Sequence, residues 1–249
     1  MPITDRQKGI LWAVIEEYAK KAEPVSSKAL SQKRGFEIGA PMIRKEMNQL
    51  EQYGFLISPH TSAGRVPTDK AYRLYIQGNM SDKSNETPKT NKEGLTSKEA
   101  EKVVVSLQKK WPDEQSLLKE ISRLASEISK ELSIAGAAGG GNLSIFGFSN
   151  LIDEPEFSSF AKVSQLMHFM DNMDHCFHSL WDKLMYENLQ VFIGDENPIK
   201  EIDEITLITG KYQLPDGDDG FIFIIGPKRM NYRRNMALVE HINEVISSL

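Results

Sequence analysis

Apolar side chains recur every three or four residues near the start of the chain, which predicts an amphipathic helix. The positions that share its buried face are Ile10, Leu11, Val14, Ile15 and Tyr18. Thr4 and Gln7 stand three residues apart at its start, as in a capping box. The helix should end near Ala22, because Pro24 disfavours helical backbone in the residue before it.

Two shorter helices should follow. The first is capped by Ser26 or Ser27 and extends to about Arg34. The second begins around Pro41, whose missing N–H does no harm in a first turn, and Gly54 closes it. The buried stripe of this third helix is Ile43, Met47 and Leu50.

A small hairpin is predicted next. Residues 55–57 have the pattern of a strand, and the polar segment 60–67 that of a loop between two short strands. Another helix should begin at Thr68 and Asp69. Three helices followed by a hairpin is the element order of a winged helix-turn-helix, which we assign to residues 1–79 as a DNA-binding domain.

The next segments predict a linker and a pair of helices. Residues 80–97 are polar and lack periodicity, which is typical of a flexible linker. Helices are expected over 97–111 and 113–134, and the glycine-rich run 135–141 predicts a hinge. We therefore assign 98–142 to connecting or dimerisation helices with this hinge. The apolar stripe of the longer helix is Leu117, Ile121, Leu124, Ile128 and Leu132. Such a stripe fits either pairing with a second copy or packing inside its own chain.

Residues 143–249 alternate between strand-like and helical patterns, so the chain as a whole is expected to be α+β. Strands are expected at 143–148, 189–193, 205–209 and 221–225, and helices at 157–170, 173–187 and 231–248.

Composition places the chain among ordinary globular proteins. Its 249 residues suit one or two domains, and 40% hydrophobic and 26% charged residues exclude wholesale disorder. No apolar stretch approaches the roughly 18 residues of a membrane span, and acids near the start argue against a secretory signal. Cys176 is the only cysteine, which excludes an intramolecular disulfide and suits a reducing cytoplasm.

Charge is distributed unevenly. The net charge of −5 argues against a protein that coats nucleic acid along its whole length. Residues 1–80, however, hold 12 Lys/Arg and 8 Asp/Glu, a net of +4, whereas 81–249 hold 18 and 27, a net of −9. We therefore expect only the first part to meet a polyanion.

The third helix carries side chains that can read DNA. Arg44, Lys45 and Asn48 should lie opposite its buried stripe. Arginine can donate two hydrogen bonds to guanine and asparagine can pair with adenine, while lysine can contact a base or a phosphate. Met42 at the start of this helix completes its candidate contacts.

Candidate backbone contacts come from the second helix and the hairpin. Ser26, Ser27 and Lys28 stand where hydroxyls and free N–H groups can hold a phosphate. In the hairpin, Gly64 permits close backbone approach and Arg65 supplies charge. The loop residues expected to take part are His60, Thr61 and Ser62.

Other functions remain alternatives at this point. A charged helix face is often merely solvated, and winged domains also serve in protein interactions. The acidic second part would suit a protein-interaction or small-molecule sensor module that does not bind DNA.

Metal and cofactor sites are not expected, and neither is enzyme activity. His175 and His178 could form a metal pair near His168 and Cys176, but no carboxylate motif completes a catalytic set. The glycines of 135–141 follow a helix, whereas a dinucleotide fingerprint follows a strand. The acidic run 216–220 lacks the distal Glu of a calcium loop and reads as a polar turn.

Several segments of the chain match one known family. The most specific is His60–Tyr75, HTSAGRVPTDKAYRLY. The other matching segments are Thr4–Lys8, Glu23–Lys28, Ile43–Met47, Phe148–Leu151, Glu154–Phe157, Ile193–Pro198 and Ile225–Tyr232. These segments resemble the HrcA family of heat-inducible transcription repressors, and His60–Tyr75 resembles its wing and following helix.

The resemblance implies a bacterial cytoplasmic repressor that binds, as a homodimer, an inverted-repeat operator in double-stranded DNA upstream of chaperone genes. The chaperonin GroEL helps keep such repressors active. The resemblance also implies that residues 143–249 form a GAF-like α/β domain, which the linker and helices join to the winged helix-turn-helix.

This chain departs from the family pattern in two places. The third helix begins Gly39-Ala40-Pro41-Met42, without the usual hydroxyl at position 42, and Lys45 replaces the usual Asn. The central region is short, so the GAF-like domain is expected to be truncated and to lack the family's inserted dimerising segment.

Overall fold

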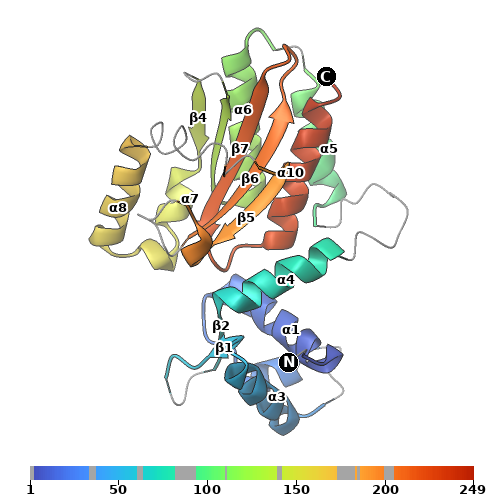
Figure 1. The fold of residues 1–249 in the computed structure, drawn as a ribbon, viewed down its shortest axis with the longest axis vertical. Coiled ribbons are helices and arrows are strands. Elements are labelled where there is room, and N and C mark those ends of the chain that lie inside the picture. Colours follow the sequence, from blue (N-terminus) through green and yellow to red (C-terminus); the bar gives the residue numbers. More distant parts are fainter. Residues whose placement is uncertain are drawn as a thin grey trace. The chain divides into compact units, whose positions relative to one another are not determined.

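The computed structural model has an α+β fold, as expected (Figure 1). Contacts divide it into two compact units, Met1–Glu86 and Thr87–Leu249. The structure describes residues 3–33, 38–60, 64–81, 94–109, 111–138, 142–172, 183, 186–198 and 205–249.

The described part of the first unit contains four helices and a two-stranded antiparallel ribbon (Figure 1). Its elements are α1 (Asp5–Lys21), α2 (Ser27–Ser31), α3 (Ala40–Gln52), β1 (Leu56–Ile57), β2 (Val66–Pro67) and α4 (Asp69–Ser81). The predicted capping box of Thr4 and Gln7 is confirmed. The helix after Ser26 is shorter than expected, since it ends at Ser31.

Gln7 has a second role that joins helices α1 and α3. Its side chain is buried, and its Nε2 donates to Glu46 Oε2 at 3.0 Å and to Gln49 Oε1 at 2.9 Å. The same residue therefore caps α1 and holds α3 against it. The fully buried core of this unit includes Ile10, Leu11, Leu30, Ile43, Leu50, Leu56 and Ile76.

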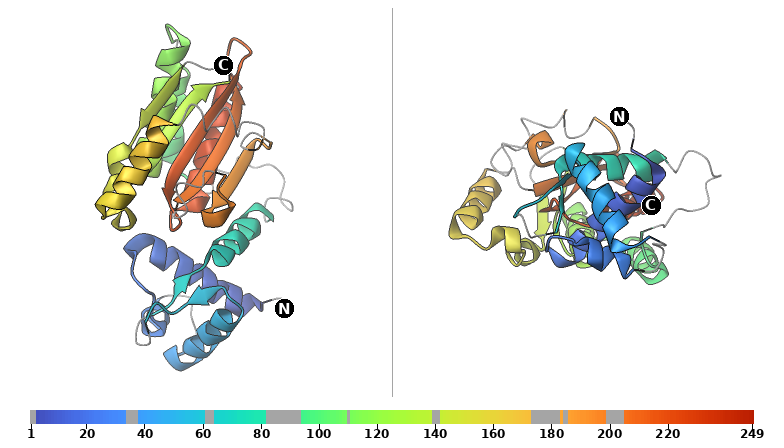
Figure 2. Two further views of the ribbon diagram at one scale, coloured as in Figure 1. Left: turned by 60° about the vertical axis from the view of Figure 1, so that its left-hand side comes forward. Right: turned by 90° about the horizontal axis from the view of Figure 1, so that it is seen from below.

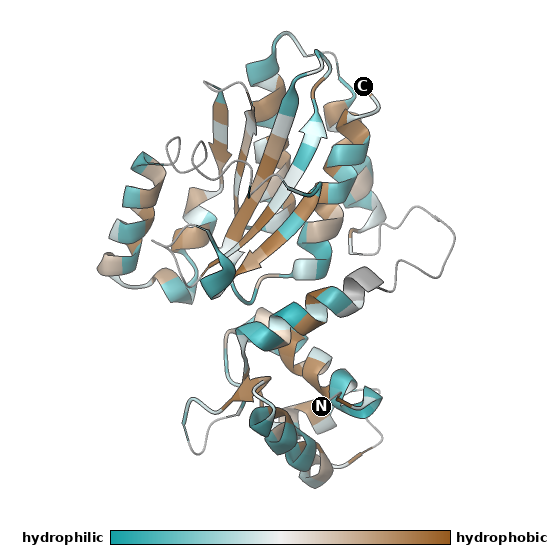
Figure 3. Cartoon of the chain, in the orientation of Figure 1, coloured by the Kyte–Doolittle hydropathy of each residue, from teal (hydrophilic) through white to brown (hydrophobic). Residues whose placement is uncertain are grey.

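The second unit is built on a five-stranded antiparallel sheet with the order β4-β3-β7-β6-β5. Its strands are β3 (Leu132–Ala137), β4 (Leu143–Phe146), β5 (Leu189–Ile193), β6 (Ile205–Gln213) and β7 (Asp219–Pro227). Strands β6 and β7 are buried over most of their length, and the middle of the sheet is mostly brown, that is, hydrophobic, in Figure 3. The polar turn predicted at 216–220 is found at 214–218, between β6 and β7, and the last two residues of the acidic run, Asp219 and Gly220, begin β7.

Helices cover both faces of this sheet (Figure 2). On one face lie α5 (Ser97–Leu107), α6 (Glu114–Ser129) and α10 (Tyr232–Ile246). Helices α6 and α10 contact the strands, and α5 packs against these two helices. The other face packs against α7 (Phe148–Ile152), the 3₁₀ helix η2 (Pro155–Phe157) and α8 (Phe160–Asp171) in one hydrophobic cluster. Because both faces are covered, the strands need not alternate apolar and polar residues.

The prediction of a helix to 134 followed by a hinge at 135–141 is wrong. Helix α6 ends at Ser129, Lys130 takes a left-handed conformation with φ 67°, and β3 follows as a fully buried strand. Gly136 is a packing requirement, since a Cβ there would lie 2.5 Å from the Phe221 ring and 2.6 Å from Leu143. A strand buried on both faces lacks the alternation that identifies strands in a sequence. Residues 139–141 lie outside the described part.

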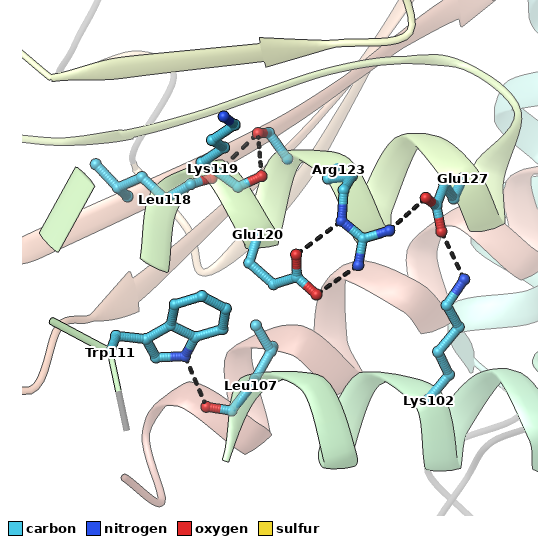
Figure 4. Close-up of polar contacts among 9 residues, drawn as sticks. Lys102, Leu107, Trp111, Leu118, Lys119, Glu120, Arg123 and Glu127 are labelled. Atoms are coloured by element: carbon cyan, nitrogen blue, oxygen red, sulfur yellow. Dashed lines mark hydrogen bonds and ion pairs between the residues drawn. The ribbon is translucent and has the colours of Figure 1, made fainter. Parts of the chain in front are cut away.

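The interpretation of the α6 stripe as a pairing surface is also wrong. Leu117, Ile121, Leu124 and Ile128 are all buried within the chain, where α6 packs on β3 and β4. The alternative, packing inside its own chain, is the one the structure supports. The exposed side of α6 instead carries an ion-pair ladder to α5, in which Arg123 joins Glu120 and Glu127, and Glu127 contacts Lys102 Nζ at 2.5 Å (Figure 4).

Two other expectations meet the structure only in part. The expected boundary at 142/143 falls between the paired strands β3 and β4, inside the second unit. The helix expected over 173–187 lies almost wholly outside the described residues. In the part of the chain that the structure describes, none of the helices is both long and apolar enough to traverse a bilayer.

Candidate nucleic-acid interface

Helix α3 presents one buried and one exposed face, as the sequence predicted. Ile43, Met47 and Leu50 are buried, whereas the residues on the opposite side are exposed: Met42, Arg44, Lys45 and Asn48. Within the described residues, no ion pair involves Arg44 or Lys45. The exposed face of α3 therefore keeps two cations available to an anionic partner.

The three candidate residues at the start of α2 differ in their exposure to solvent. Ser26 is exposed and its hydroxyl accepts from the Ala29 N–H at 3.1 Å, which caps the helix. Lys28 is exposed, but Ser27 is buried with 8% of its surface exposed. Ser26 and Lys28 are accessible to a ligand, and Ser27 contributes mainly to the core.

The ribbon is tied to the segment before α2. Strands β1 and β2 pair Leu56 with Pro67 and Ile57 with Val66. Beyond them, the Val25 N–H donates to the Arg65 carbonyl at 2.9 Å and the Arg65 N–H to the Val25 carbonyl at 2.8 Å. His60 is exposed, and Thr61 and Ser62 lie outside the described residues.

Gly64 is required by this pairing. A Cβ at Gly64 would lie 2.4 Å from the carbonyl carbon and oxygen of Val25, closer than real contacts allow. The close backbone approach that the sequence suggested at this glycine is thus made to the chain itself.

The Arg65 side chain is engaged within the unit and is only 19% exposed. One terminal nitrogen, NH2, donates to Asn48 Oδ1 at 2.9 Å and lies 2.9 Å from Glu51 Oε2. The other, NH1, donates to Ser58 Oγ at 3.3 Å. We call Arg65, Asn48, Glu51 and Ser58 the ribbon clamp, because they join the ribbon to α3. Glu51 and Ser58 are not among the residues predicted from the sequence, because nothing local marks contacts with a residue 14 or 7 positions away.

The end of α3 is fixed by a second set of contacts. Thr68 Oγ1 donates to the Gly54 carbonyl at 2.8 Å. Lys70 Nζ donates to the Tyr53 carbonyl at 2.8 Å and lies 4.5 Å from the centre of the Phe55 ring. These contacts satisfy carbonyls at the helix end and fix where β1 begins.

Charged groups of the second unit gather where the sheet ends, and we call them the sheet-end cluster: Glu131, Glu154, Glu156 and Arg229. Arg229 Nε donates to Glu156 Oε1 at 2.7 Å, and its NH2 also pairs with Glu154. Burial raises the pKa of Glu131 to about 9, and the charge of Glu154 adds to this. Glu154–Phe157 and Ile225–Tyr232, two of the segments that carry the family resemblance, thus meet here.

Metal-binding chemistry is weakly represented. His168 is exposed, and His175, Cys176 and His178 lie outside the described residues. Among the described side chains, Glu114, Asp216 and Asp218 bring carboxylate oxygens within 4.8 Å of one another, but the two aspartates are exposed. Exposed acids at a polar turn are ordinary surface features.

Comparison with known proteins gives a consistent result. A family model described as the HrcA protein C terminal domain matches residues 73–236. The heat-inducible transcription repressor HrcA of Natranaerobius thermophilus is 27% identical over 341 residues, covering 100% of this chain and 98% of that protein. The repressor of the same name from Thermodesulfovibrio yellowstonii is 28% identical, with 95% of each chain covered.

The length of these alignments agrees with a shortened chain. The alignment with the Natranaerobius protein spans 341 positions and holds all 249 residues, so about 92 positions have no counterpart here. A crystal structure described only as a hypothetical protein matches with a TM-score of 0.77 at 18% identity, covering 99% of this chain and 98% of that one. At that identity, the likeness concerns the fold alone.

Proposed function

The chain belongs to the HrcA family of heat-inducible transcription repressors, and from that premise we propose that it represses chaperone genes by binding an inverted-repeat operator as a dimer. Transcription regulation, repression and the stress response are the family's activities, and its members are not enzymes. The observation that carries the proposal is the exposed face of α3, where Arg44 and Lys45 have no ion-pair partner among the described residues.

In this proposal, residues 1–79 act as a winged helix-turn-helix domain. Helix α3 enters the major groove, where Arg44 and Asn48 contact base edges. Lys45 contacts a base or a phosphate, and Met42 contacts the methyl group of a thymine. Ser26 and Lys28 hold a phosphate at the start of α2. The ribbon, with the loop from His60 through Thr61 and Ser62 to Gly64, flanks the groove.

The remainder of the chain is proposed to regulate that domain. The linker predicted at 80–97 lies between α4, which ends at Ser81, and α5, which begins at Ser97. The sheet unit is a truncated GAF-like domain. The two-fold symmetry of an inverted repeat calls for a dimer, whose surface is not the α6 stripe, because that stripe is buried within the chain. A GroEL-type chaperonin as partner and a cytoplasmic location follow from the family.

A titration against DNA tests the proposal. The full chain should shift a duplex carrying an inverted repeat from a chaperone promoter at much lower concentration than a scrambled duplex of equal length. Arg44→Ala should lose about 1–3 kcal/mol of operator binding and relax preference at one base pair. Lys20→Ala removes an exposed charge from α1 and serves as the control. Equal affinity of the wild type for both duplexes would contradict the proposal and favour a protein-interaction or sensor module.

Dimerisation has its own measurement. Sedimentation equilibrium of the full chain with and without the duplex should give two copies bound to each inverted repeat. A monomer under both conditions would rule out the dimeric part of the proposal.

A further inference from the structure

We propose that Arg65 is a positioning residue that holds Asn48 and Glu51 of α3 in place for base reading, and that it does not contact a phosphate. This rests on the proposed function, because it concerns how the same surface recognises DNA. It assigns a different role to an arginine that charge alone would place on the DNA backbone.

The first argument is the use of the guanidinium. Arginine carries five N–H donors in a rigid fork, and here both terminal nitrogens contact the chain itself. The NH2 nitrogen contacts Asn48 and Glu51, and the NH1 nitrogen contacts Ser58. With 19% of the side chain exposed, little of the charge faces outward. Arg44 and Lys45, by contrast, are exposed and lack ion pairs within the described residues.

The second argument is the orientation of the Asn48 amide. Because Arg65 donates to Asn48 Oδ1, the amide nitrogen is turned away from the clamp. Within the described residues Nδ2 makes no hydrogen bond, so it can donate to N7 of an adenine, and the second lone pair of Oδ1 can accept from N6. An amide without this partner could turn over and present donor and acceptor in reverse, so the clamp fixes the pattern that is read.

The third argument is electrostatic. Glu51 stands three residues after Asn48 on the same side of α3 and is 33% exposed. An unpaired carboxylate there would repel the phosphates beside the reading residue. Its ion pair with Arg65 offsets that negative charge.

The backbone of Arg65 is fixed as firmly as its side chain. Two hydrogen bonds to Val25 hold its peptide groups, and Gly64 permits this approach. The fork therefore starts from a defined point, as a positioning role needs.

The test uses the full chain and duplexes that the wild type itself selects from a randomised pool. Base preference is measured for Asn48→Ala, Arg65→Ala, the double variant and Arg65→Lys. Lys20→Ala, which removes an exposed charge from α1, is the control and should leave base preference unchanged. We expect Arg65→Ala to lose discrimination at the base pair that Asn48→Ala affects, by roughly five- to 150-fold. The double variant should lose no more than either single one. Arg65→Lys should not restore the preference, because a single ammonium cannot hold a fork of partners.

Opposite results would overturn the inference. If Arg65→Ala weakens binding to all duplexes alike, lowers the salt slope by about one and is restored by Arg65→Lys, Arg65 contacts a phosphate. If Arg65→Ala fails to fold, as judged by its unfolding transition, Arg65→Lys decides alone: retained base preference refutes a clamp and lost preference supports it. A wild type that selects no duplex would refute the proposed function as well.

Discussion

Replacing Glu131 with Gln tests how the second unit tolerates a buried acid. Glu131 has 6% of its surface exposed, and no hydrogen-bond partner of Oε2 occurs among the described residues. The carboxyl packs against Gly226, where a Cβ would lie 2.2 Å from Oε2. Burial, and secondly the charge of Glu154, raise its pKa to about 9, although Arg229 opposes this. At neutral pH the folded chain therefore keeps this acid protonated.

The size of the effect follows from proton linkage. The folded pKa of about 9 lies above the ordinary value of 4.5, so the unfolded chain releases a proton that the folded chain retains. The stabilisation is complete below pH 4.5 and is lost as pH rises towards 9, at about 1.4 kcal/mol per pH unit. By pH 7.5 the free energy of unfolding should have fallen by about 4 kcal/mol. Gln has the shape of the protonated acid and cannot ionise.

Urea denaturation at a series of pH values measures the difference in the free energy of unfolding between Glu131→Gln and the wild type. The difference should be near zero at pH 4.5 and should rise by about 4 kcal/mol in favour of the variant by pH 7.5. Other titrating groups cancel in this comparison. Glu187→Gln, which replaces an exposed acid of the same unit, should show no such rise. Parallel pH profiles for Glu131→Gln and the wild type would refute the reasoning.

Two further predictions concern the first unit. Gly64→Ala should force the ribbon away from Val25, because the added Cβ would lie 2.4 Å from that backbone. Faster amide exchange at Val25 and a lower unfolding temperature would show this, and unchanged exchange would contradict it. A hydrogen bond from Lys21, and to a lesser extent one from Lys33, lowers the pKa of Glu17 to about 2. The resulting stabilisation is present above pH 4.5 and is lost as pH falls towards 2, so Glu17→Gln should be less stable than the wild type at pH 7 and equal to it near pH 2. Acid titration of both proteins by circular dichroism measures this, and an equal gap at every pH would exclude it.

Local features of this protein were readable from its sequence because they depend on residues three or four apart. The capping box of Thr4 and Gln7 and the two faces of α3 both follow helical periodicity, and both are found in the structure. The polar turn between β6 and β7 follows from residues that favour turns, although it ends at 218 and not at 220 as predicted. The candidate cations Arg44 and Lys45 were placed correctly on the exposed side for the same reason.

Only the tertiary structure decided which partner each element meets. An apolar stripe on a helix says that it is covered but not by what, and α6 is covered by the sheet of its own unit. Strand β3 was mistaken for a helix end and a hinge because a strand buried on both faces shows no alternation. The charge of Arg65 by itself predicts a contact with the DNA backbone. Its proposed role depends instead on Asn48 and Glu51, which are 14 or more residues away in the sequence and are brought close by folding. Periodicity determines local structure, whereas contacts distant in sequence determine what a side chain is able to do.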